Sequence, residues 1–274
     1  MIIYSEIDYD HLKKDRAISE DVNYSPHFHQ KYELLYVINI GDLAYFNLGA
    51  AKYSVRTGDI ILIKPGVLHN LQIPSDTAYD RIVISFSKVD VNSDLHECLN
   101  GMQGLYHLMS PSHPLKYIFD LLLYSENMFS EKEFKPYLKD TTNMILAHLK
   151  HLSNENESAY LIPDPTIQKI FTYIEEHITE PLNADILSKE FFISKSWLSH
   201  NFKKYLNISL KKYINQKKLL HIDRLIAAGI PIMKAVESCS YTNYTTFFRQ
   251  YKQYTNSNPL KTKQKNHDRS DADN

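Results

Sequence analysis

The stretch Ile193–Lys204, ISKSWLSHNFKK, decides the fold of the C-terminal part of this chain. Ser194 is of a residue type that caps helix N-termini, and a run with helical periodicity follows it. Apolar residues at i, i+4, i+7 and i+8 form one face of the expected helix: Leu198, Phe202, Tyr205 and Leu206. Polar and basic residues form the opposite face: Ser196, Ser199, His200 and Lys203. Such a face suits a helix that enters a DNA major groove, although for one isolated helix a face that is simply exposed to solvent is the favoured interpretation.

The same design returns in residues 240–252, SYTNYTTFFRQYK. Phe247, Tyr251 and Tyr254 recur at helical spacing, while Thr245, Arg249 and Lys252 share the outer face. Each copy follows a short helical pattern, at 184–190 and at 232–238, which makes two helix-turn-helix units. Residues 210–228 are expected to form one long helix, ended by Gly229 and Pro231. Such a connector can hold two DNA-reading helices about one turn of duplex, ~34 Å, apart.

Residues 166–262 resemble the tandem helix-turn-helix domain of AraC/XylS-type transcription regulators. The resemblance is carried by Ile193, Ser194, Leu198, Phe202, Lys203, Lys204, Tyr241, Phe247, Arg249, Tyr251, Lys252, Asn258 and Pro259. Members of that family often have glycine in the turn of each unit, where a positive φ is convenient. This chain has Phe192 and Ser240 there, and a residue with a side chain costs about 1 kcal/mol in that conformation.

The resemblance also implies which side chains contact DNA. In the first unit Ser196, Ser199 and His200 are expected to reach base edges, while Lys203 and Lys204 contact phosphates. In the second unit the expected contacts are Tyr244, Thr245 and Arg249, with Lys252 on phosphate. Arg249 either reads a guanine through two hydrogen bonds or is held in a salt bridge or on phosphate.

Composition places the chain among soluble globular proteins of two domains. There is no apolar run of about 18 residues and no signal-peptide pattern, so we expect a cytoplasmic protein without a membrane span. Cys98 and Cys239 form no motif and are expected to be reduced. The net charge of −1 hides an asymmetry, because residues 164–274 hold 17 of the 31 basic residues but 11 of the 32 acidic ones. The basic half therefore suits DNA, whereas the acidic half has another task.

The N-terminal half has the pattern of a small β-barrel or jelly roll. Strands are expected at 32–40, 43–48, 60–63 and 81–86, with turn residues between them, whereas residues 1–20 look like a polar arm. Residues 25–87 resemble a cupin domain, a resemblance carried by His27, Phe28, His29, Glu33, Gly41, Gly58, Asp59, Gly66 and His69. The chain departs from many cupins at Lys64, where proline is common.

Three histidines and a glutamate in this half form a candidate site. Strand alternation places His27 and His29 on one face, and with Glu33 and His69 they make a suitable ligand set for a divalent metal. In metal-binding cupins these positions are the ligands. The alternative, which we favour here, is a barrel whose polar side chains hydrogen-bond a polyhydroxylated effector without metal. The expected effector-binding residues are His27, His29, Glu33, Tyr36, His69 and Arg81, with Tyr24, Tyr36 or Phe46 stacking on a sugar ring.

Two amphipathic helices, around 115–123 and 134–152, follow the strands and either cover the barrel or pair with a second subunit. We therefore predict an α+β multidomain protein: a cupin-like effector-sensing and dimerisation domain at 1–152, a linker at 153–165, an all-α tandem helix-turn-helix domain at 166–262 and a disordered tail at 263–274. The expected function is transcription regulation, as an activator that responds to a sugar. Promoter DNA, the sugar, a second copy of the chain and RNA polymerase are the expected partners, with no cofactor and no catalytic residue. The alternative is a metal-dependent cupin enzyme fused to a DNA-binding module.

Overall fold

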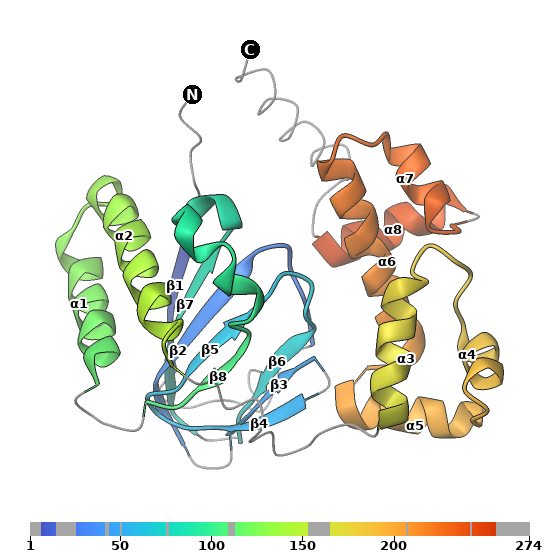
Figure 1. Ribbon diagram of the computed structural model, residues 1–274, viewed down its shortest axis with the longest axis horizontal. Coiled ribbons are helices and arrows are strands. Elements are labelled where there is room, and N and C mark those ends of the chain that lie inside the picture. The colour runs from blue at the N-terminus through green and yellow to red at the C-terminus, as the bar shows by residue number, and fades with distance from the viewer. Residues whose placement is uncertain are drawn as a thin grey trace. The chain divides into compact units, whose positions relative to one another are not determined.

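The computed structural model describes residues 7–14, 26–41, 44–49, 51–74, 77–108, 113–152, 165–206, 208–241 and 243–255. The chain divides into two compact units, residues 2–162 and residues 163–274 (Figure 1). The expected linker residues 153–164, the tail and the Asn258-Pro259 pair lie outside the described residues. Among the helices that are described, none has the length and apolar character needed to cross a membrane.

The N-terminal unit contains two antiparallel sheets. The larger has the strand order β1-β7-β2-β5-β8 and the smaller β4-β3-β6. The strands are β1 Asp8–Lys14, β2 Tyr32–Ile40, β3 Ala44–Leu48, β4 Ala51–Val55, β5 Ile60–Ile63, β6 His69–Gln72, β7 Tyr79–Phe86 and β8 Gly104–Tyr106. Short 3-10 turns lie at Lys88–Asp90, Ser93–Leu95 and Cys98–Asn100. The predicted β-barrel with a helical hairpin is confirmed as a fold class, since the two sheets enclose one apolar core that includes Leu35, Phe46 and Ile61.

Strand alternation divides β2 between two environments. Leu35 and Val37 face the core between the sheets, whereas Leu34 and Tyr36 face a second core on the other side of the large sheet. Helices α1 Pro114–Met128 and α2 Glu131–Leu149 cover that second side (Figure 1). Their buried faces supply Leu115, Ile118, Phe119, Leu122, Leu138, Ile145, Leu146 and Leu149. The helices therefore complete the core, as one of the two expectations had it.

The N-terminal segment differs from the expected polar arm. Residues Asp8–Lys14 form an edge strand that pairs antiparallel with β7, with Asp10 opposite Val83. Its polar composition suits an edge strand, because one side of the strand remains open to solvent. Strands β4, β6 and β8 were also absent from the sequence prediction.

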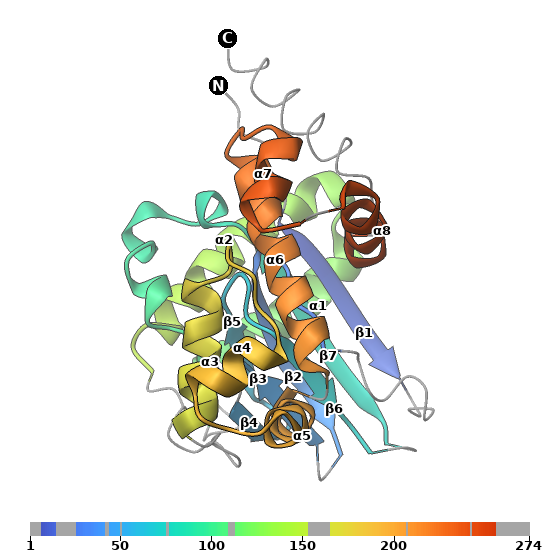
Figure 2. The same ribbon diagram turned by 90° about the vertical axis from the view of Figure 1, so that its right-hand side faces the viewer.

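The C-terminal unit is helical. Its helices are α3 Pro165–Glu176, α4 Ala184–Glu190, α5 Lys195–Leu206, α6 Leu210–Ala227, α7 Ile232–Ser238 and α8 Tyr244–Thr255. Within this unit α5 lies near the start of α6, and α8 lies beside the later part of α6 (Figures 1 and 2). Figure 1 shows α5 and α8 running in nearly the same direction, and Figure 2, turned by 90°, views both close to end-on. Two nearly parallel helices joined by one long connector match the tandem arrangement that the sequence predicts.

Both inter-helix turns contain a non-glycine residue in the left-handed region. Phe192, between α4 and α5, has φ 53°, and Ser240, between α7 and α8, has φ 57°. These are the two positions where glycine is often found in the family that the sequence resembles. The Phe192 side chain is 95% exposed, so almost no packing energy offsets the strain of its backbone conformation. The Ser240 hydroxyl donates a 2.7 Å hydrogen bond to the carbonyl oxygen of Thr179, which offsets part of its backbone cost.

Candidate functional site

The outer face of α5 is exposed as predicted. Ser194 begins the helix, because its hydroxyl accepts a 3.1 Å hydrogen bond from the Trp197 backbone N–H. The inward residues Leu198, Phe202, Tyr205 and Leu206 are buried. All five expected contact residues of this helix are exposed: Ser196, Ser199, His200, Lys203 and Lys204. Trp197 lies at the boundary and is partly buried.

Helix α8 repeats this division. Phe247 and Tyr251 are fully buried and pack against Ile222 of α6. The side chain of Tyr254 lies outside the described residues. The expected contact residues Tyr244, Thr245, Arg249 and Lys252 are all exposed. The structure therefore leaves both polar faces accessible, although the DNA contacts themselves stay a prediction.

A buried lysine of α6 connects the segment that precedes α4 with the turn that follows α7. Lys218 is 7% exposed, and its ammonium donates 2.8 Å hydrogen bonds to the carbonyl oxygens of Glu180 and Cys239. Glu180 lies between α3 and α4, just ahead of the first helix-turn-helix pair, and Cys239 follows α7 in the turn of the second pair. Burial lowers the pKa of the Lys218 ammonium. The sequence analysis did not single out this residue, since a lysine in a basic helix gives no sign that it is buried.

The predicted histidine cluster is assembled in the N-terminal unit. His27 forms a two-way backbone bridge with His69, through N–H to carbonyl hydrogen bonds of 3.1 and 2.9 Å. Nε2 of His29 lies 2.7 Å from Oε2 of Glu33, and Nε2 of His69 lies 3.7 Å from the same oxygen. One ligand atom from each of these four residues lies within 4.8 Å of the others. The sequence motif therefore brings its four members to one point.

The orientation of the two rings in this cluster follows from their hydrogen bonds. Nδ1 of His29 donates to the carbonyl oxygen of Lys31, and Nδ1 of His69 donates to that of Val67. These bonds fix the rings so that both Nε2 atoms face Glu33. Burial alone would raise the pKa of the Glu33 carboxyl, but its contacts with His29 and His69 outweigh burial and hold the pKa below its usual range.

A cavity of about 150 Å³ opens beside this cluster. It is lined by Asp10, His27, Glu33, Phe46, His69, Asn70, Leu71, Arg81 and Val83. Arg81 thus lies on the cavity wall. Asp10 and Asn70 escaped the sequence analysis, because each lies on a strand, β1 or β6, that was not predicted. The buried Nδ2 of Asn70 has no hydrogen-bond partner in the described part of the chain, while its Oδ1 accepts from Asn47.

The expectation that Tyr36 binds the effector is wrong. It faces the helix side of the large sheet, where its ring stacks on Phe119 at a centroid distance of 3.9 Å. Strand alternation explains this position, because residues 33 and 36 of one strand point to opposite faces. Tyr36 therefore does not line the cavity, and Phe46 is the aromatic residue that does. Tyr24 lies outside the described residues.

The donor set also fits a divalent transition metal. Three imidazoles and one carboxylate are suitable ligands, and carbonyl-bound Nδ1 atoms are the usual second contacts of metal-binding histidines. Four ligands about 2.1 Å from a tetrahedral ion would lie about 3.4 Å apart, so the 4.8 Å cluster would close slightly around a metal.

Comparison with known proteins agrees with both halves. The family described as AraC-like ligand binding domain matches residues 16–131, and the one described as helix-turn-helix domain matches residues 187–265. The regulatory protein SoxS of Escherichia coli is 31% identical over 94 residues, which cover 34% of this chain and 88% of SoxS. The uncharacterized HTH-type transcriptional regulator YijO of Escherichia coli is 22% identical over 143 residues, half of each chain. A crystal structure of apo ToxT from Vibrio cholerae covers 93% of this chain and 96% of its own at 13% identity, with a TM-score of 0.40.

The fold and the two sites define a class of protein: a DNA-binding protein that carries a ligand-binding domain with a small polar cavity. This chain belongs to the AraC family of DNA-binding transcriptional regulators. The named relatives are regulators, so the alternative of a cupin enzyme is set aside.

Proposed function

We propose that this protein activates transcription when a sugar binds in the cavity beside Glu33. The observation that supports the proposal is the lining of the cavity, which places charged groups next to one aromatic face. Glu33 and Asp10 can accept hydrogen bonds from hydroxyls, Arg81 can donate them, and Phe46 offers a ring on which a sugar can stack. The volume of about 150 Å³ restricts the ligand to a small molecule.

The effector acts by shifting the equilibrium between two arrangements of the protein. It changes transcription only if it binds one arrangement of the protein more tightly than another. The test uses the full chain and duplex DNA from upstream of its own gene, with a panel of sugars added. We expect one sugar to raise the melting temperature of the protein and to increase transcript in a reaction with RNA polymerase. A panel without any thermal shift would contradict the sugar, and transcript that falls with the ligand would contradict activation.

Arg249 tests the reading of bases. Arg249→Ala should weaken binding to the upstream site by about 1–3 kcal/mol, while binding to an unrelated duplex stays nearly unchanged. Lys252→Ala is the matched control, because loss of a phosphate contact weakens binding to both duplexes alike. Equal losses for Arg249→Ala on the two duplexes would remove its base-reading role.

We further propose that the protein is a homodimer that pairs through α1. The outward face of this helix carries Tyr117, Leu121, Tyr124 and Met128, all exposed, at successive spacings of four, three and four residues. This is the spacing of a helix that packs along a second helix, and the same stripe on a second copy is self-complementary. Leu121→Glu should yield monomers in sedimentation, whereas Val89→Glu, at another exposed apolar residue, should not. A dimer that survives Leu121→Glu would exclude this interface.

A second candidate is a regulator that responds to a divalent metal rather than to a sugar. It is favoured by the orientation of His29 and His69, whose Nδ1 atoms are occupied by carbonyls and whose Nε2 atoms face Glu33. Equilibrium dialysis of the full chain against zinc, nickel or cobalt should then give one ion per chain. His69→Ala should abolish this binding, and His96→Ala, outside the cluster, should retain it. Substoichiometric metal in the unaltered protein would refute this candidate.

A further inference from the structure

Two concavities in the C-terminal unit meet on the first two turns of α6. One, of about 530 Å³, extends to Lys195 and Ser199 of α5. The other, of about 350 Å³, extends to Gln250 of α8. Ser209, Lys211 and Asn215 line both. The two concavities therefore form one groove that leads from the first recognition helix, across α6, to the second.

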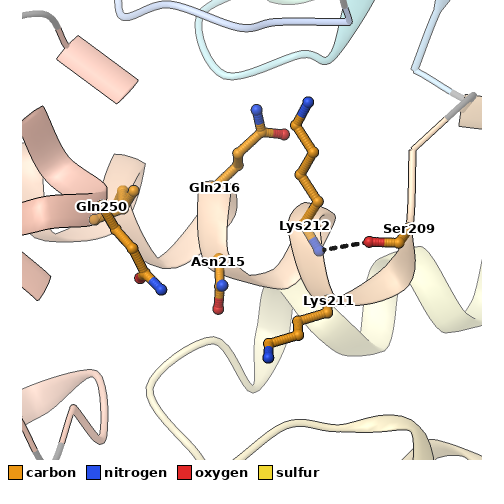
Figure 3. Close-up of a pocket in the computed structure, with 7 residues that line it drawn as sticks. Ser209, Lys211, Lys212, Asn215, Gln216 and Gln250 are labelled. Carbon is orange, nitrogen blue, oxygen red and sulfur yellow. Dashed lines mark hydrogen bonds between the residues drawn. The ribbon is translucent and has the colours of Figure 1, made fainter. Parts of the chain in front are cut away.

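The side chains of α6 divide between two sides at this point. Figure 3 shows Lys211, Asn215 and Gln250 extending to one side of the helix, whereas the ends of Lys212 and Gln216 extend to the other. Lys211 and Lys212 are both exposed, and neither forms an ion pair within the residues that the structure describes. Elsewhere in the groove the charge of Lys195 is paired with Asp185. Lys211 is thus a cation available to an external anion.

We propose that Lys211, Asn215 and Gln250 hold the DNA phosphate backbone that lies between the two major grooves entered by α5 and α8. The inference rests on the proposed reading of DNA by these two helices. Two parallel helices in successive major grooves leave a stretch of sugar-phosphate backbone facing the connector between them. A lysine and two side-chain amides are groups that commonly bind phosphate, and they fix the register of the protein on the duplex without reading its sequence.

The neighbouring lysine supplies a matched control. Lys211→Gln and Lys212→Gln remove the same charge from adjacent exposed positions of one helix. Lys211 lines both concavities, whereas Lys212 lines only the smaller one and its end extends to the other side of the helix. Binding of the full chain to its upstream duplex and to an unrelated duplex is measured by fluorescence anisotropy over a series of salt concentrations. For Lys211→Gln we expect a loss on the order of three- to tenfold on both duplexes, and a salt slope smaller by about 0.9. For Lys212→Gln we expect the slope to stay at the value of the unaltered protein.

Two results would overturn the proposal. One is an equal change of slope for the two variants, which would mean that Lys211 acts only through net charge. The other is a loss for Lys211→Gln on the upstream duplex alone, which would make it a base contact. Failure of the proposed sequence-specific reading gives a different result: the unaltered protein would bind both duplexes equally, and the slopes on the unrelated duplex would still compare the two lysines.

Discussion

Replacement of Lys218 tests whether its two hydrogen bonds from α6 stabilise the arrangement of the two helix-turn-helix units. Lys218→Met keeps the length and the apolar stem of the side chain but removes its ammonium. Two hydrogen bonds of 2.8 Å are lost, to the carbonyl oxygens of Glu180 and Cys239. Hydrogen bonds from a charged donor contribute about 1.5–3 kcal/mol each, which gives a gross loss of about 3–6 kcal/mol.

Part of this loss is recovered, because the buried ammonium no longer has to be desolvated. Its lowered pKa reflects that cost. We therefore expect Lys218→Met to reduce the free energy of unfolding of the C-terminal unit by about 2–4 kcal/mol. The assay is urea denaturation of the full chain followed by tryptophan fluorescence, since Trp197 is the single tryptophan of the sequence and lies in α5.

Lys212→Met is the control, because this exposed lysine of the same helix should change stability by less than about 0.5 kcal/mol. If Lys218→Met unfolds with the same free energy as the Lys212→Met control, the two carbonyl contacts contribute nothing and the reasoning fails. Loss of the two Lys218 hydrogen bonds should also affect DNA binding. If the two helix-turn-helix units can move relative to each other, the spacing of α5 and α8 is no longer fixed. Binding to the upstream duplex should then weaken, as does the free energy of unfolding.

Two further predictions concern the turns and the cavity. Phe192→Gly should raise the free energy of unfolding by about 0.5–1 kcal/mol, since glycine adopts the left-handed conformation without strain but loses more entropy on folding. Ser240→Gly should gain less or nothing, because it also removes the hydrogen bond to Thr179; urea denaturation of both variants compares the two turns. Phe46→Ala should abolish the thermal shift caused by the effector, whereas Tyr36→Phe should leave that shift unchanged because Tyr36 lies on the other face of the sheet; the reverse order would show that the ligand binds elsewhere.

Several elements have the bounds that the sequence predicts. Strand β2 and strand β5, and helices α4 and α7, have the bounds expected from their patterns. Strand β1 escaped because an edge strand needs only one buried side, and its alternating charged residues look like a solvated arm. Strand β6 escaped because His69 and Asn70 are polar residues that the fold buries. The pattern of apolar residues predicts the elements that build the core. It does not predict a strand whose buried residues are polar because they belong to a site.

The same limit applies to the candidate site. The grouping of His27, His29, Glu33 and His69 was predicted from their ligand chemistry together with the resemblance to cupins, in which these positions are the ligands. The expected strand alternation was not the reason that they meet, because His27 and His29 precede β2. The face on which Tyr36 lies could have been predicted from the sequence. Residues 33 and 36 of one strand point to opposite faces, so Tyr36 and Glu33 cannot line the same cavity. Lys218 could not be found in this way, since its role depends on which carbonyls the two units bring to the same side of α6.

Strand β1 joins the cavity to the helix proposed for pairing. Asp10 lines the cavity, while Tyr9 and His11 point to the other face of the sheet. There the Tyr9 hydroxyl donates a 3.0 Å hydrogen bond to Glu126 of α1, and His11 contacts both Glu126, at 3.1 Å, and Asp80, at 2.8 Å. The two neighbours of Asp10 on this strand therefore contact α1 directly, so a ligand that displaced Asp10 would act next to the contacts with Glu126. The proposed effector site and the proposed pairing helix are therefore connected through one strand, β1.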